Sequence, residues 1–457
     1  MCTKIPLVAI LLFTASCSNT SDNKLVREEI PPSAASIPTL KKGILEEHRI
    51  SIKGNHPYSV YIPSTFDSLQ RLPVTILLDP QGAASEVISK YSFIAENHRR
   101  ILVCSEDFKN GMDADASLQV ISSLIEEAIH VLRADPSAIH LMGFSGGARA
   151  SIIAGGQIPG ISSLTYCGAA PPSGSISLRI PSLGIAGIRD MNFTEVLYFT
   201  SSLDTTFNKP TMLATATHHE WPDTATFRII SGWAEIVSCR KSTRCDSTII
   251  QQTATLTKAR IKLQRDPILR DLLLRFMGTT FDGFIPLNEE NKEMQTNLRS
   301  REFGSSLNAF RTGLQFETAV RQEFADAFKA KDLNWWKPRI DDLMNKKSDP
   351  VFDRLLGHVS LAAYTYSRLS IDRSNGQDAA YFLQLYEMAD PQNPEWAYLR
   401  ACYAEQSGDR NTAVIFLEKA YSLGLRDSDK LKNEQWLQNT MNDSRVVAIM
   451  QRMDQKR

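Results

Sequence analysis

The chain has 457 residues, and at roughly 150 residues per domain this length predicts about three folded units rather than one small module. Hydrophobic residues make up 42% and charged residues 22%, an ordinary globular composition that argues against a fibrous or largely disordered chain. Lysine plus arginine equals aspartate plus glutamate at 51 each, so no net positive charge would draw the protein to nucleic acid.

The first 17 residues have the layout of a secretory signal. A lysine precedes an apolar run from Ile5 to Phe13, and three small residues then lead to Cys17. The run is shorter than the about 20 apolar residues that a membrane-spanning helix needs. Small residues that end on a cysteine resemble the lipobox of bacterial lipoproteins, which implies a signal peptide at residues 1–16, lipidation of Cys17 and a flexible polar tether over residues 17–42. A buried N-terminal strand or helix is the alternative.

From about residue 47 to 235, short apolar runs alternate with longer amphipathic segments. The segments HRISIKG and YSVYIP predict a hairpin, and continuously apolar runs predict buried strands in PVTILLDP, RILVCSED, IHLMGFSG, LTYCGAA and LGIAGIRD. Helices are predicted around Ser85–Asn97 and over Ala116–Leu132. This alternation predicts a mostly parallel, doubly wound sheet with helices on both faces.

Beyond about residue 225 the sequence carries no convincing strand run. Apolar residues at spacings of three and four predict helices that include Ile268–Phe276, Phe316–Ala330, Leu355–Leu369, Ala379–Ala389 and Glu395–Gln406. The second half is therefore predicted to be all-helical.

The last part of the chain has the features of a helical repeat. The small residues Ala401, Gly408, Ala413 and Ala420 have the spacing of the tetratricopeptide helix pair, in which small side chains let two antiparallel helices approach closely. A generic helical hairpin is the alternative, and either interpretation predicts a short solenoid. The sequence thus predicts three regions, which are an α/β domain over 43–240, a helical linker region over 241–345 and tetratricopeptide-like repeats over 346–457.

Ser145 is the candidate nucleophile. It lies in Gly143-Phe144-Ser145-Gly146-Gly147, directly after a predicted strand and before a predicted helix. This is the context of the nucleophile elbow, a turn so tight that glycines flank a serine exposed above the sheet. The alternative is a glycine-rich helix start in which the serine is an ordinary turn residue.

A nucleophilic serine needs a base, and the base needs an orienting carboxylate, in the chain order serine, acid, histidine. Of the eight histidines only His218 and His219 follow the serine at a suitable distance, and two solvated loop histidines are the alternative reading. Asp190 ends the run LGIAGIRD, so it would lie at the carboxyl edge of the sheet beside the serine. Glu195 is the alternative acid.

Acyl transfer also needs N–H donors for the negative charge that develops on the substrate oxygen. Gly146, directly after the nucleophile, is the first candidate. The second is Gln81 or Gly82, in the loop that closes PVTILLDP, because the preceding Pro80 has no N–H. No metal and no organic cofactor is implied.

Several of these segments together resemble α/β-hydrolases of the extracellular esterase type, which includes polyhydroxybutyrate depolymerases and feruloyl or acetyl-xylan esterases. The segments are LLDPQGA, Lys109–Gly111, GFSGGARA, GIAGIRD and HEWP, and the resemblance covers roughly residues 45–240. It implies an α/β-hydrolase fold with Ser145 as the nucleophile, Asp190 as the acid and His219, the histidine before x-W-P, as the base. It also implies an ester substrate, either a small acyl ester or a polysaccharide-linked ester.

The sequence therefore predicts a lipid-anchored, exported serine esterase that acts through an acyl-enzyme, and a peptidase on the same triad is kept as a further reading. Fusion of such a hydrolase to helical repeats resembles a type of bacterial envelope lipoprotein, which implies a place at the outer membrane or in the periplasm. The alternative is a catalytically idle scaffold whose repeats bind a protein partner. Because all three triad candidates are present, the enzyme is favoured.

Export would also allow disulfides to form. Cys239 and Cys245 are close enough in sequence to close a small loop and are a candidate pair. Cys104 and Cys167 lie inside apolar runs, where a buried and inert thiol is expected.

Overall fold

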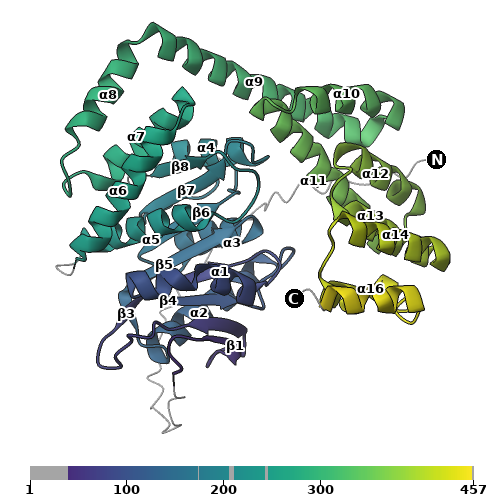
Figure 1. The fold of residues 1–457 in the computed structure, drawn as a ribbon, viewed down its shortest axis with the longest axis horizontal. Coiled ribbons are helices and arrows are strands. Elements are labelled where there is room, and N and C mark those ends of the chain that lie inside the picture. The colour runs from purple at the N-terminus through teal and green to yellow at the C-terminus, as the bar shows by residue number, and fades with distance from the viewer. Residues whose placement is uncertain (1–39, 173, 205–209, 242–244, 455–457) are drawn as a thin grey trace, which may run out of the picture. The chain divides into compact units, whose positions relative to one another are not determined.

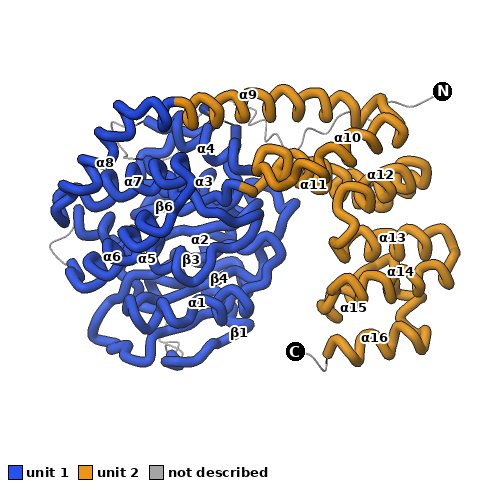
Figure 2. The backbone as a smooth tube through the Cα atoms, turned by 45° about the horizontal axis from the view of Figure 1, so that its top comes forward, with its two compact units in different colours: residues 1–188, 192–304 blue, residues 189–191, 305–457 orange. Residues whose placement is uncertain are grey.

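The computed structural model describes residues 40–172, 174–204, 210–241 and 245–454 (Figure 1). The predicted signal peptide, Cys17 and the tether up to residue 39 lie outside the described residues. Contacts divide the chain into unit 1 (Met1–Ile188 and Asn192–Gly304) and unit 2 (Arg189–Met191 and Ser305–Arg457), which Figure 2 colours separately. None of the helices in the described part of the chain has the length and apolarity to cross a membrane.

Within the described residues, unit 1 contains an eight-stranded sheet with the strand order β1-β2-β4-β3-β5-β6-β7-β8. The strands are β1 (Leu45–Ile50), β2 (Pro57–Tyr61), β3 (Leu72–Leu78), β4 (Ile101–Ser105), β5 (Ala134–Phe144), β6 (Ser163–Cys167), β7 (Ser182–Gly187) and β8 (Thr211–Thr215). β1 pairs antiparallel with β2, β2 pairs antiparallel with β4, and all other pairs are parallel. The predicted hairpin and the predicted buried strands are confirmed, whereas β8 was not predicted.

Helices cover both faces of this sheet. α1 (Ala84–His98) and α5 (Thr224–Cys239) share an apolar core with Leu77 and Met142 of the central strands. Successive strand residues point to opposite faces, so the equally buried Leu141 faces the other side, where α2 (Ala114–His130) and α3 (Gly146–Gln157) contact β5. Burial on both faces is the reason that the central strands are continuously apolar.

The core of unit 1 extends beyond residue 240, the end that the sequence predicts for the α/β domain. α6 (Ser247–Leu263) and α7 (Pro267–Phe281) contribute Ile250 and Phe276 to the same apolar core as the sheet strands. Unit 1 accordingly runs to Gly304, past α8 (Asn288–Arg299), so the first part of the predicted linker region belongs to the sheet unit. Apolar spacing predicts that a segment is helical, but it does not identify the surface against which the helix packs.

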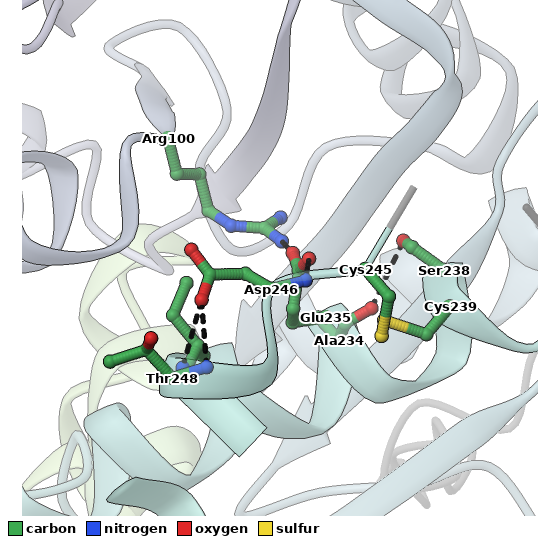
Figure 3. The surroundings of a disulfide bond; sticks show 9 residues. Arg100, Ala234, Glu235, Ser238, Cys239, Cys245, Asp246 and Thr248 are labelled. Atoms are coloured by element: carbon green, nitrogen blue, oxygen red, sulfur yellow. Dashed lines mark hydrogen bonds and ion pairs between the residues drawn. A yellow bond between two sulfur atoms is a disulfide. The ribbon is translucent and has the colours of Figure 1, made fainter. Parts of the chain in front are cut away.

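A disulfide between Cys239 and Cys245 closes the corner between α5 and α6 (Figure 3). Next to it, Asp246 caps α6, because its carboxylate accepts hydrogen bonds from two N–H groups of the first turn. Glu235 of α5 accepts the Asp246 N–H at 3.4 Å and lies 4.0 Å from the buried guanidinium of Arg100. The cysteine pair that the sequence suggested is thus bonded in the structure.

In its described part, unit 2 consists of helices and the loops that connect them, with no strand. Its helices are α9 (Arg301–Ala330, with its first turn in unit 1), α10 (Leu333–Lys346), α11 (Pro350–Asp372), α12 (Gly376–Ala389), α13 (Pro394–Gln406), α14 (Arg410–Leu423), α15 (Ser428–Asn433) and α16 (Ser444–Asp454). α11 packs on α12 and α13 packs on α14, and Ala401, Ala413 and Ala420 are buried in the second pair. Consecutive packed helices agree with the predicted solenoid, and the tetratricopeptide assignment stays a prediction.

The short loop Arg189–Met191, which follows β7 in the chain, belongs to unit 2 by its contacts. The Arg189 guanidinium donates to Asp353 Oδ2 at 2.8 Å and to two carbonyl oxygens of the α10–α11 turn. Arg321 of α9 donates to the carbonyl oxygen of Met191. Side chains of two unit 2 helices therefore hold this loop.

Candidate active site

Ser145 occupies a backbone conformation that L-amino acids rarely adopt. Its φ is +52° and its ψ is −118°, and it connects the last residue of β5 to the first residue of α3. A Cβ atom at Gly143 would lie 2.1 Å from the carbonyl oxygen of Gly147, so the turn has no room for a side chain there. This geometry is that of the nucleophile elbow which G-x-S-x-G predicts, and it projects the serine hydroxyl from the end of the strand.

His219 lies in the loop between β8 and α5, and its Nε2 atom is 3.0 Å from Ser145 Oγ. Both side chains are partly buried, whereas the neighbouring His218 is exposed. The ring of Phe144 packs against the His219 ring, with the ring centres 4.7 Å apart. A hydroxyl within hydrogen-bond distance of an imidazole nitrogen is the arrangement in which the imidazole can take the hydroxyl proton.

The two candidate acids, Asp190 and Glu195, lie in different surroundings. Asp190 is only 1% exposed, and it follows β7 two residues after Ile188, whose N–H donates to Thr215 at the end of β8 at 2.8 Å. Glu195 is bonded elsewhere, because its Oε1 atom accepts from Arg149 at 2.6 Å and from the Ala170 N–H at 2.7 Å. The role of Asp190 stays a prediction, and it is the better candidate of the two.

The predicted oxyanion donors differ in how their N–H groups are hydrogen-bonded. Gly146 is the first residue of α3, so its N–H lies outside the hydrogen bonding of the helix itself. The N–H of Gln81 instead donates to Asp79 Oδ1 at 2.8 Å, and the N–H of Gly82 donates to the Asp79 carbonyl oxygen at 3.2 Å. An aspartate commonly captures N–H groups that follow it in a turn. An oxyanion would therefore have to replace Asp79 as the acceptor of either amide.

Asn110 was not predicted as a site residue. A Cβ atom at Gly146 would lie 1.7 Å from Asn110 Oδ1, so the Asn110 carboxamide covers the residue that follows the nucleophile. The Asn110 backbone N–H donates to the carbonyl oxygen of Pro80 at 2.8 Å, which holds this residue at the turn after β3. The sequence signal for Asn110 was its place in the Lys109–Gly111 segment, which the resemblance included without a role.

Asp79 of the LLDPQGA segment and Trp221 of the HEWP segment are hydrogen-bonded to each other beside the site. The Trp221 indole N–H donates to Asp79 Oδ2 at 2.7 Å, although the two residues are 142 positions apart in the sequence. The next residue, Pro222, accepts a hydrogen bond from the Tyr91 hydroxyl at 2.6 Å. Burial raises the pKa of Tyr91, so this phenol stays protonated and able to donate. The loop that carries His219 is thus anchored directly after the histidine.

The mostly parallel sheet with an elbow at the end of β5 is an α/β-hydrolase fold, as the sequence predicts. No protein-family model and no curated protein sequence matches the chain. A feruloyl esterase module from Clostridium thermocellum, a serine-to-alanine mutant complexed with sinapinate, is similar in structure, with a TM-score of 0.33 and 11% identity over 39% of this chain and 83% of that chain. A protein from Klebsiella pneumoniae assigned as a dienelactone hydrolase has a TM-score of 0.32 and 15% identity over 38% of this chain and 87% of that chain.

Proposed function

We propose that the chain is a serine hydrolase that cleaves a carboxylic ester through an acyl-enzyme intermediate. The observation that carries the proposal is the 3.0 Å distance between Ser145 Oγ and His219 Nε2, at a serine held in a strained elbow. Strained backbone is costly and is found chiefly where function requires it. The pair supplies the two groups that every serine esterase needs, a nucleophile and a base.

In the first step His219 Nε2 takes the Ser145 hydroxyl proton while Oγ attacks the ester carbonyl carbon. The carbonyl oxygen gains a negative charge, and the Gly146 N–H, the first after the nucleophile, is the proposed donor of a hydrogen bond to it. The protonated His219 then gives its proton to the departing alcohol, and the acyl group remains on Oγ. Water repeats the sequence with His219 as the base, which releases the acid and restores the serine.

Asp190 is the proposed third member of the triad. A buried carboxylate in this role would keep the imidazole in the tautomer whose Nε2 accepts the serine proton, and it would stabilise the imidazolium that forms. Its position in the chain, three residues after the end of β7, agrees with the order serine, acid, histidine.

Export and lipidation at Cys17 are proposed together with this activity. The bonded Cys239 and Cys245 support an oxidising compartment, since structural disulfides persist chiefly outside the cytosol. The helical unit would then be available to bind a protein partner in the cell envelope, and a small acyl ester or a polysaccharide-linked ester is the proposed substrate class.

The proposal is tested with a form that lacks residues 1–39 and so keeps every described residue. Hydrolysis of p-nitrophenyl acetate and butyrate should be measured for the wild type, Ser145→Ala and His219→Ala, with His218→Ala as the matched control. Turnover that falls by at least about a thousandfold in the first two variants and persists in the control is expected. A folded wild type without turnover would contradict the enzyme and favour the scaffold alternative.

A further inference from the structure

Asp79 stands directly after β3 and is 5% exposed, so its carboxylate has lost most of its water. Three N–H groups replace that water. Oδ1 accepts the N–H groups of Gln81 at 2.8 Å and Ala83 at 3.1 Å, and Oδ2 accepts the Trp221 indole N–H at 2.7 Å. Hydrogen bonds to a charged acceptor are stronger than neutral ones, and a buried acceptor is costly to leave unpaired. One side chain thus joins the turn after β3 to the loop after β8.

Trp221 follows His219 by two residues, and its partly buried ring packs against two other aromatic rings. The ring centre of Trp221 lies 5.4 Å from that of Phe144 and 6.1 Å from that of Tyr91. Phe144 also contacts the His219 ring, and it immediately precedes Ser145 in the chain. The base, the tryptophan and the residue before the nucleophile therefore form one packed group.

The same turn is in close contact with the elbow. A Cβ atom at Gly147 would lie 2.2 Å from the carbonyl oxygen of Leu78, the residue before Asp79. The segment Leu78–Asp79 thus touches the nucleophile elbow through its backbone and the base loop through its carboxylate. The backbone of this segment and the Asp79 carboxylate thus connect the elbow that carries Ser145 with the loop that carries His219.

We infer that Asp79 and Trp221 are positioning residues of this site, whose mutual hydrogen bond holds His219 at the serine hydroxyl. The inference rests on the proposed function. It adds to that function a role for Trp221, the tryptophan of the HEWP segment. Neither residue takes part in proton transfer. Both act on the geometry of the base, and a misplacement of about 1 Å can lower a rate by about a hundredfold.

The first variant is Trp221→Phe, which keeps an aromatic ring between Phe144 and Tyr91 and removes the indole N–H. Its matched control is Trp436→Phe in unit 2, which also removes an indole hydrogen bond to a carboxylate, from Nε1 to Asp372 Oδ1 at 3.3 Å. With p-nitrophenyl butyrate, Trp221→Phe is expected to lower kcat by about tenfold or more and to leave KM within about twofold. The control is expected to leave both constants within about twofold.

The second variant is Asp79→Asn, which keeps the size of the side chain and removes its charge. It is expected to lower kcat in the wild-type background, and its effect should shrink by at least about threefold in the Trp221→Phe background, because the shared hydrogen bond is already absent there. Thermal melts of all variants identify any that do not fold, and each single variant tests the inference without the other.

The outcomes separate the two claims. A folded wild type without turnover would overturn the proposed function and this inference with it. An active wild type whose kcat is the same in Trp221→Phe and Asp79→Asn would overturn the inference alone. Additive effects of the two substitutions would also overturn it, because they would mean that Asp79 and Trp221 act separately.

Discussion

A Cβ atom on Gly147 would lie 2.2 Å from the carbonyl oxygen of Leu78, so the first turn of α3 and the end of β3 meet at backbone distance. Real Cβ atoms do not approach a backbone oxygen so closely, and the obstacle is main chain rather than a flexible side chain. The absence of a side chain at residue 147 is therefore a condition for the elbow to stand where it does.

Gly147→Ala is expected to displace the elbow and to lower kcat/KM by about a hundredfold or more. Overpacking of this kind also costs about 1–3 kcal/mol of stability, which lowers Tm by several degrees in a domain of this size. Gly278→Ala in α7 is the control, because its Cβ would meet only the Met294 Cε atom at an ordinary 3.5 Å. An active Gly147→Ala variant with the wild-type Tm would contradict this account of the elbow.

The sequence predicted the central strands and the elbow for a shared physical reason. Strands buried on both faces must be continuously apolar, and a strand-to-helix turn that leaves no space for side chains must use glycine, so both features are local properties of the chain. β8 was missed because threonine stands at both ends of Thr211–Thr215, which leaves an apolar run of only three residues, Met212, Leu213 and Ala214.

The features that the sequence did not predict depend on contacts between segments that are far apart in the chain. The bond from Trp221 to Asp79 spans 142 positions, and the capture of the Gln81 N–H by Asp79 depends on how the turn closes. The packing of α6 and α7 on the sheet core likewise depends on which surface meets their apolar faces. Local patterns specify elements, but they do not specify these partners.

The ion pair between Arg189 and Asp353 holds the loop of the candidate acid Asp190, within unit 2. Asp353→Ala removes this pair and is expected to lower kcat about threefold to tenfold with little change in KM, because the acid would lose part of its positioning. Asp341→Ala, which removes an exposed pair with Lys337 on α10, is the control and should leave kcat unchanged. Equal kcat values for the two variants would show that the Arg189 pair has no part in catalysis.

The bond between Cys239 and Cys245 closes a short loop at the corner between α5 and α6. In the chain-entropy account a loop of this length stabilises the folded state by about 2 kcal/mol. A Cys239→Ser/Cys245→Ser variant should therefore have a lower free energy of unfolding, and reductant should lower that of the wild type but not that of the variant. Equal stability of the wild type with and without dithiothreitol would contradict a stabilising role.

Burial lowers the pKa of His98 to about 4, and the nearby positive charge of Arg100 acts in the same direction. The unfolded state, with an ordinary pKa of 6.5, binds the proton more readily. His98 therefore makes the folded state lose stability as the pH falls from about 6.5 toward 4, by about 2 kcal/mol at pH 5.

His98→Gln is expected to reduce the loss of unfolding free energy between pH 7.5 and pH 5 by that amount, as measured by denaturant unfolding at each pH. His130→Gln is the matched control, because His130 also ends a helix of unit 1 but is exposed. A pH dependence of His98→Gln that equals that of the wild type would show that the buried imidazole is not the group responsible.

The claim that Ser145 is a nucleophile activated by His219 is tested most directly by locating a covalent adduct. The wild-type protein should be treated with a fluorophosphonate probe, digested and analysed by mass spectrometry, beside His219→Ala and His218→Ala. A single adduct on the peptide that contains Ser145, present in the wild type and His218→Ala and lost in His219→Ala, is the expected result. An adduct on another serine, or equal labelling of Ser145 in His219→Ala, would contradict the proposed site.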